Sequence, residues 1–320
     1  MESSKIFLTF VGALKKMLSL QSMRSDTLWK RLAGQYDEGE AKAIVRMVLE
    51  VRFGLSWTDI VCGKADELKA DELTALEAIM QRLEQGEPVQ YVLGQAEFGG
   101  RTFHVEPGVL IPRPETQWMC DFVANSWGIV PREGSILDIG TGSGCIACTI
   151  AADLQNHPVE VVAWDISDTA LRIASENARR LNVHVTFEKR DVLGEVRGTR
   201  CEVRGARYGV RGTGCEERWD IIVSNPPYVC EQEKASIGRH VLEHEPGLAL
   251  FVPDDDPLLF YRHIGRYALN ALKPEGYLLV EINSRFGKET SALMADLGFV
   301  GVRLFPDLYE KDRFVIAYKA

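Results

Sequence analysis

Apolar residues recur with the spacing of an amphipathic helix in the first quarter of the chain. Residues 40–53 carry one such face, made by Ala41, Ile44, Val45, Val48 and Leu49. Residues 71–84 repeat the pattern and stop before Gly86. Residues 6–20 predict a further amphipathic helix, which is too short and too charged to span a membrane. The pattern predicts a small helical domain over residues 1–86.

The pattern changes at residue 87, where glycine, proline, aromatic and β-branched residues replace the helical period. Two short runs of strand-forming residues flank Gly99 and Gly100, and a glycine pair between such runs is typical of a tight β-turn. We therefore predict a β-hairpin linker over residues 87–106, between the helical domain and the rest of the chain.

Short apolar runs then alternate with helical periods as far as the C-terminus. The runs cover residues 136–139, 160–164, 183–189, 219–224 and 276–282, and a final pair covers residues 300–305 and 313–318. Strands that alternate with helices build a parallel sheet, because each helix carries the chain back to start the next strand. The predicted fold class is α/β, with a mostly parallel sheet and an antiparallel C-terminal hairpin over residues 107–320.

Composition narrows the class of protein. The 320 residues carry a formal net charge of -9 and a pI near 5.3, which speaks against a general affinity for nucleic-acid phosphates. The seven cysteines are scattered without the paired spacing of a zinc site, as is typical of the reducing cytosol. We therefore expect a cytoplasmic protein without a metal. An arginine- and glycine-rich stretch at residues 194–217 breaks the alternation and predicts a surface insertion.

Three of the predicted strands are followed by residues that suit a nucleoside. The turn after the first strand consists of Gly140, Thr141, Gly142, Ser143 and Gly144. We expect its backbone N–H groups to face a ligand. The second strand ends in Asp165, which can accept both ribose hydroxyls or cap the next helix instead, and Asp191 and Val192 after the third suit an adenine. The spacing is GxGxG, not the GxGxxG of dinucleotide sites, so we predict a nucleoside pocket without a pyrophosphate.

The fourth strand stops at Asn225, Pro226, Pro227 and Tyr228. Two prolines cannot continue a sheet ladder, so the chain must turn there. The turn offers an amide side chain, the Pro226 carbonyl and an aromatic ring, which together suit a planar NH₂ group. A plain strand-ending turn is the alternative interpretation. Next to a nucleoside pocket, the turn predicts transfer of a methyl group from a sulfonium donor to an amide-like nitrogen, by positioning alone.

These motifs resemble one known family, the protein-(glutamine-N5) methyltransferases that act on peptide chain release factors. The resemblance rests on Glu87-Pro-Val-Gln-Tyr91, Ile111-Pro-Arg-Pro-Glu-Thr116, Asp138-Ile-Gly-Thr-Gly-Ser-Gly144, Asp165, Asn225-Pro-Pro-Tyr228 and Glu245-Pro246. It covers nearly the whole chain except the arginine- and glycine-rich insertion. It implies a Rossmann-like class I methyltransferase sheet, S-adenosyl-L-methionine as the cofactor and S-adenosyl-L-homocysteine as its product.

The resemblance also implies a role for each motif. Gly140 to Gly144 and Asn225 would face the cofactor, with Asp165 on the ribose and Asp191 and Val192 on the adenine. Asn225, Pro226 and Tyr228 would be the catalytic residues. The glutamine of the Gly-Gly-Gln tip of the release factor would be held by Asn225, Pro226, Pro227, Tyr228, Arg113, Glu115 and Glu245.

The helical domain would then dock the bulk of the release factor. We expect a monomer, with no membrane association and no stable nucleic-acid binding. Two other substrates suit the same turn, a glutamine of a ribosomal protein and an adenine N6 of nucleic acid. A nucleoside-binding regulatory module without catalysis is the alternative from another class of function.

Overall fold

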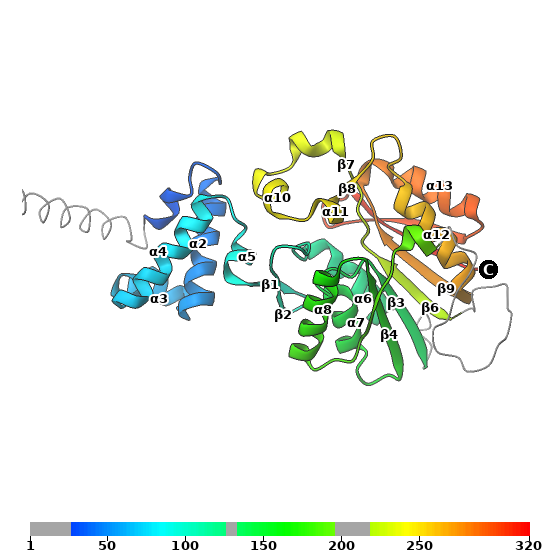
Figure 1. Cartoon of the computed structure of the whole chain (residues 1–320), viewed down its shortest axis with the longest axis horizontal. Coiled ribbons are helices and arrows are strands. Elements are labelled where there is room, and N and C mark those ends of the chain that lie inside the picture. The colour runs from blue at the N-terminus through cyan, green and yellow to red at the C-terminus, as the bar shows by residue number, and fades with distance from the viewer. Residues whose placement is uncertain (1–26, 126–132, 196–217) are drawn as a thin grey trace, which may run out of the picture. The chain divides into compact units, whose positions relative to one another are not determined.

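The structure is a computed structural model that describes residues 27–125, 133–195 and 218–320 (Figure 1). The predicted helix over residues 6–20 and residues 196–217 of the predicted insertion lie outside these ranges. The chain divides into two compact units, Met1–Gly94 and Gln95–Ala320, which we call the helical unit and the sheet unit. The division therefore falls inside the stretch that the sequence assigns to a linker.

Short helices surround an apolar core in the helical unit. Its described elements are η1 (Leu28–Arg31), α2 (Glu38–Phe53), α3 (Trp57–Val61), η2 (Lys64–Glu67), α4 (Ala70–Glu84) and α5 (Val89–Leu93). Asp37 caps α2 by accepting from the backbone N–H of Glu40, and Gly54 ends the helix in the left-handed conformation. The apolar faces predicted for α2 and α4 are buried in one hydrophobic cluster, and both predicted helices are confirmed.

A seven-stranded sheet forms the centre of the sheet unit. Its strands are β3 (Gly134–Ile139), β4 (Val159–Asp165), β5 (Thr186–Lys189), β6 (Trp219–Ser224), β9 (Leu272–Glu281), β10 (Val300–Pro306) and β11 (Asp312–Tyr318). The strand order is β10-β11-β9-β6-β3-β4-β5, and only the pairs that involve β11 are antiparallel. The prediction of a mostly parallel sheet with an antiparallel C-terminal hairpin is confirmed.

Helices cover both faces of this sheet (Figure 1). One face packs on α6 (Gln117–Asn125), α7 (Cys145–Asp153) and α8 (Asp168–Leu181). The other packs on α9 (Val192–Glu195), α12 (Leu259–Ala271) and α13 (Gly287–Leu297). Side chains alternate along the strands, so that Ile136 belongs to the first cluster and Leu137 to the second.

Smaller elements complete the sheet unit. They are the hairpin β1 (Gln95–Phe98) and β2 (Arg101–His104), η3 (Pro114–Thr116), β7 (Val229–Cys230), η4 (Glu231–Ser236), α10 (Arg239–His244), α11 (Gly247–Leu250), β8 (Phe251–Val252) and η5 (Ser284–Phe286). Gly99 and Gly100 both have positive φ, as the predicted hairpin turn requires. Among the described residues no helix is both long and apolar enough to cross a membrane.

Candidate active site

The ends of three neighbouring strands form one edge of a cavity of about 380 Å³, a size usual for a small-molecule site. The parallel register pairs Ile139 with Trp164 and with Ser224. The residues that follow these three are Gly140, Asp165 and Asn225, and all of them line the cavity. Register alone therefore brings together the three motifs that the sequence placed at separate strand ends.

Most of the predicted cofactor residues line this cavity. They are Gly140, Gly142, Asp165, Asp191, Val192 and Asn225, while Thr141 and Ser143 are buried beside it. Pro226 and Pro227 also line it. Of the remaining predicted residues, Gly144, Tyr228, Arg113, Glu115 and Glu245 are not in its lining.

The N–H groups of the glycine turn bond mainly to the end of β4, which differs from the expectation that they face a ligand. The N–H groups of Gly140 and Thr141 both donate to the Trp164 carbonyl at 2.9 Å, and that of Gly142 donates to the Asp165 carboxylate at 2.9 Å. Gly140, Gly142 and Gly144 all have positive φ, and a Cβ on Gly144 would lie 2.9 Å from the Cβ of Ala174. Glycine is thus required for the shape of the turn and for its packing on α8.

Asp165 has acceptor capacity left for a ligand. Its Oδ2 accepts from the Gly142 N–H and its Oδ1 accepts from the Ser167 N–H, each at 2.9 Å, and the Ile166 N–H also bonds to the carboxylate, so that part of its acceptor capacity is left for a ligand. The alternative role as helix cap falls to Ser167, whose hydroxyl accepts from the Ala170 N–H. Burial raises the pKa of Asp165, although these backbone bonds favour its ionised form.

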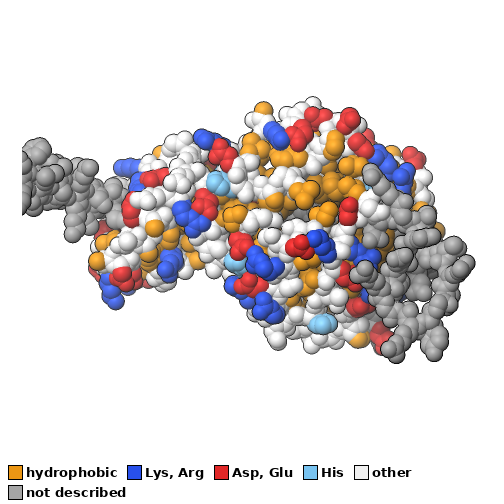
Figure 2. All heavy atoms as spheres, viewed as in Figure 1, with side chains coloured by type: hydrophobic (Ala, Val, Ile, Leu, Met, Phe, Trp, Pro, Cys, Tyr) orange, Lys and Arg blue, Asp and Glu red, His pale blue; other side chains and the backbone are white. Residues whose placement is uncertain are grey.

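The mouth of the cavity has an apolar rim. Ile166, after β4, and Leu248, on α11, line the cavity and are 45% and 66% exposed. Figure 2 shows hydrophobic side chains gathered on the surface of the sheet unit around α10 and α11. The cavity lining is itself mostly apolar, which suits a ligand with a flat ring and a flexible tail.

An ion pair fixes the segment beside this mouth. Arg113 donates to Glu245 at 2.6 Å, and the Ile111 N–H donates to the other Glu245 oxygen at 3.2 Å. The Glu245 side chain is almost fully buried, whereas that of Arg113 is 30% exposed, so the ion pair is partly shielded from solvent. These two residues therefore contact each other, and Glu115 is half-buried. Burial raises the pKa of Tyr228, and the charges of Glu281 and Glu115 raise it further.

Behind Asn225 lies a buried chain of hydrogen bonds that sequence reasoning missed. The Asn225 Nδ2 donates to the Thr116 hydroxyl at 3.2 Å, and this hydroxyl donates to Glu281 Oε2 at 2.6 Å. Tyr228 is not among the residues that line the cavity, and its hydroxyl donates to Glu281 Oε1 at 3.0 Å. Thr116 and Glu281 are 165 residues apart, and only the folded sheet brings them together.

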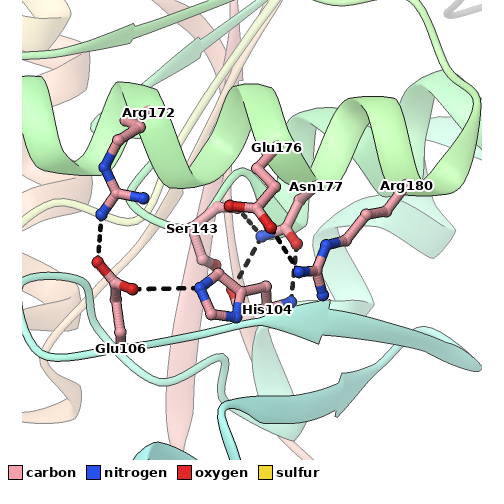
Figure 3. Close-up of polar contacts among 7 residues, drawn as sticks. All are labelled: His104, Glu106, Ser143, Arg172, Glu176, Asn177 and Arg180. Carbon is pink, nitrogen blue, oxygen red and sulfur yellow. Dashed lines mark hydrogen bonds and ion pairs between the residues drawn. The ribbon is translucent and has the colours of Figure 1, made fainter.

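A second buried amide, Asn177 on α8, joins three segments (Figure 3). Its Oδ1 accepts from the His104 N–H at 2.7 Å, and its Nδ2 donates to the carbonyls of His104 at 2.9 Å and of Ser143 at 2.8 Å. Figure 3 also shows Glu106 between Arg172 and the His104 ring. The hairpin end, α8 and the glycine turn are thus fixed to one another. No motif or periodicity in the chain predicts this contact.

Two protein families match this chain, one in each of its two units. A sequence profile described as PrmC N-terminal domain matches residues 29–94, and one described as Methyltransferase domain matches residues 132–297. A protein of Bacteroides thetaiotaomicron named release factor glutamine methyltransferase is 42% identical over 284 residues, covering 88% of this chain and 94% of its own.

Two further relatives carry the same name. The protein of Flavobacterium psychrophilum is 38% identical over 286 residues, covering 89% of this chain and 94% of its own. That of Streptococcus pneumoniae is 35% identical over 290 residues, covering 90% of this chain and 94% of its own. The similarity therefore extends over both units.

The Asn177 contacts predict weaker cofactor binding when the amide is lost. Asn177→Asp keeps the size of the side chain but cannot donate to the Ser143 carbonyl, so the glycine turn loses a support. We expect the dissociation constant for S-adenosylmethionine, measured by titration calorimetry, to rise about tenfold. Glu176→Gln, on the preceding residue of α8, is the control and should bind as the wild type. An unchanged constant in a folded Asn177→Asp protein would show that the turn does not depend on this amide.

The buried carboxyl of Asp138 predicts a dependence of stability on pH. Burial raises the pKa of Asp138 from 3.8 to about 7, even though the Thr141 hydroxyl donates to it. Between these values the folded protein binds more protons than the unfolded chain, so stability falls as pH rises and is fully reduced above pH 7. Asp138→Asn keeps the acceptor and removes the charge. It should reduce this loss between pH 5 and 8 by at most about 3 kcal/mol.

Thermal unfolding midpoints of the wild type and Asp138→Asn at pH 5 and pH 8 measure this difference. The control is Asp255→Asn, which changes the same group at an exposed position. Parallel pH profiles for all three proteins would contradict the prediction.

Proposed function

The chain belongs to the release factor glutamine methyltransferase family, and on that premise we propose how its site works. It transfers a methyl group from S-adenosylmethionine to the side-chain amide nitrogen (N5) of the glutamine in the Gly-Gly-Gln motif of peptide chain release factors. The observation that carries this proposal is the amide of Asn225 at the cavity, tied back through its Nδ2 to Thr116.

The orientation of Asn225 suits a planar NH₂ group as the acceptor of the methyl. Because Nδ2 bonds to Thr116, the amide oxygen Oδ1 is left to accept an N–H from the substrate. The Pro226 carbonyl, the next acceptor along the turn, can take the second N–H. Two fixed acceptors hold the nitrogen in place and stabilise the positive charge that develops on it during transfer.

The cavity fits the predicted cofactor. When bound, S-adenosylmethionine supplies an electrophilic methyl group and leaves as S-adenosylhomocysteine. The remaining acceptor capacity of Asp165 suits the ribose hydroxyls, and Asp191 and Val192, which also line the cavity, would take the adenine. The glycine turn contributes shape, since the N–H groups of Gly140, Thr141, Gly142 and Gly144 are already bonded within the protein.

No charged catalytic group is needed in this scheme. The amide nitrogen gains the methyl and loses a proton to solvent, and the protein contributes placement and exclusion of water. The apolar lining and the prolines Pro226 and Pro227 make the acceptors rigid, so that little reorganisation is required at the moment of transfer. Tyr228 supports this arrangement from behind, through its bond to Glu281.

The partner in this proposal is a protein. The Arg113–Glu245 pair would keep the segment beside the mouth in the shape that admits the Gly-Gly-Gln tip, with Glu115 next to it. The helical unit would dock the body of the release factor. A monomer and the lack of stable nucleic-acid binding stay predictions.

Transfer of labelled methyl from S-adenosylmethionine to an unmethylated release factor tests the proposal. We expect label on the wild-type release factor and none on a variant with alanine for glutamine in the Gly-Gly-Gln tip. Asn225→Ala should lower kcat/KM about 100-fold or more, because an acceptor used in the transition state is lost. Its affinity for S-adenosylmethionine should stay within about threefold, since most cofactor contacts remain.

Asn270→Ala, which removes an exposed amide on α12, is the matched control and should transfer methyl as the wild type does. A protein that binds S-adenosylmethionine but labels no release factor would contradict the proposed acceptor. Ribosomal proteins and then nucleic acid would be the next substrates to try.

A further inference from the structure

The orientation of the Asn225 amide is set by residues that are not in the cavity lining. The Thr116 hydroxyl carries a single hydrogen, and this hydrogen is directed at Glu281 Oε2, only 2.6 Å away. Towards Asn225 the hydroxyl can therefore offer only a lone pair. A lone pair binds the NH₂ end of an amide and repels its oxygen, so Nδ2 faces Thr116 and Oδ1 must face away from it.

Glu281 is placed to enforce this direction. Its side chain is fully buried at the end of β9, and it accepts from two hydroxyls, those of Thr116 and Tyr228, one on each oxygen. A carboxylate can only accept, whereas a protonated carboxyl or an amide in its place would have to donate to one of these hydroxyls. Donation to Thr116 would free the Thr116 hydrogen to point at Asn225 and would favour the flipped amide.

We propose that Glu281 is a positioning residue for methyl transfer, which through the Thr116 hydroxyl keeps the Asn225 amide oxygen turned to the substrate. Glu281 itself is fully buried and is not in the cavity lining, so it acts on the acceptor only through other side chains. Through Tyr228 it also fixes the far end of the Asn225–Tyr228 turn, so one carboxylate holds both ends of the acceptor segment. The inference rests on the proposed function and names the residues that prepare its acceptor.

The charge state of Glu281 reflects several neighbours. The groups that act on it, or on which it acts, are Tyr228, Arg313 of β11, Glu115 of η3, Tyr261 of α12 and Cys145 of α7. The pKa of Glu281 is raised to about 7. Burial is the main cause and the charge of Glu115 adds to it, while the bonds from Thr116 and Tyr228 and the charge of Arg313 act in the opposite direction. Ionisation, and with it the acceptor-only form, is therefore completed as pH rises through neutrality.

Thr116 offers an isosteric test. Thr116→Val removes the hydroxyl and keeps the shape, whereas Thr116→Ser keeps the hydroxyl. We expect the single-turnover rate of methyl transfer to release factor to fall about tenfold or more in Thr116→Val and to be restored to within about threefold in Thr116→Ser. The dissociation constant for S-adenosylmethionine should not change in either. Thr290→Val is the matched control, since Thr290 is a fully buried threonine of α13 whose hydroxyl finds no partner among the described residues.

Glu281→Gln gives a second and independent measurement. In the wild type the single-turnover rate should rise as pH increases through about 7, the pKa of Glu281. In Glu281→Gln the rate should be low and this rise should be absent, with cofactor affinity kept. Loss of the rise in Asp138→Asn together with its persistence in Glu281→Gln would overturn the inference, because Asp138 also has a pKa raised to about 7.

The outcomes separate the inference from the proposed function. If the wild type labels release factor and Thr116→Val transfers methyl at the wild-type rate, the positioning role is wrong and the proposed function stands. If the wild type labels no release factor, the proposed function has failed first. If Thr116→Val does not fold, the pH profile of Glu281→Gln decides.

Discussion

The site depends on the parallel register between β3 and its two neighbours. Ile139 is opposite both Trp164 and Ser224, so the chain leaves the three strands at the same level of the sheet. A shift of one residue in either pairing would move Asn225 or Asp165 by more than 3 Å and would turn its side chain to the other face. Because both faces of these strands are buried in separate apolar clusters, such a shift would also place the wrong side chains in each core. The packing that stabilises the sheet therefore also fixes the positions of the groups that bind the ligand.

Two buried carboxyls lower the stability of the folded chain. Asp138 and Glu281 are both fully buried, and burial raises the pKa of each to about 7, so their ionised forms destabilise the folded chain. Each accepts from a threonine hydroxyl that belongs to the site, Thr141 in the glycine turn and Thr116 behind Asn225. An apolar residue at either position would stabilise the core but would leave that hydroxyl free to turn. The two carboxyls thus lower the stability of the folded chain and in return fix the direction of the two threonine hydroxyls.

The helices, the strands and the motifs at the strand ends could be predicted from the sequence, because they depend on local patterns of residues. The period of α2 and α4, the glycine pair of the hairpin and the prolines at Pro226 and Pro227 each act on the few residues around them. Sequence reasoning did not reach Thr116, Glu281 or Asn177, whose contacts join residues that are tens to more than a hundred positions apart. It also misjudged the N–H groups of the glycine turn, since their partner, the Trp164 carbonyl, lies on another strand. A single sequence carries no record of which distant side chains meet, and a threonine before a helix looks like a cap whether or not a carboxylate lies behind it.

An acceptor made of neutral groups must be ordered before the substrate arrives. An amide and a backbone carbonyl have no net charge with which to draw a substrate into place, so their effect on the transition state depends on direction more than on field strength. Asn225 has two ends of nearly equal size and opposite hydrogen-bonding character, and a free amide would present the wrong end part of the time. Thr116 follows Pro112 and Pro114, and Asn225 precedes Pro226 and Pro227, so both segments that meet behind the acceptor are stiff. With Glu281 taking the only hydrogen of Thr116, rigidity of the backbone and direction of the hydrogen bonds act on the same amide.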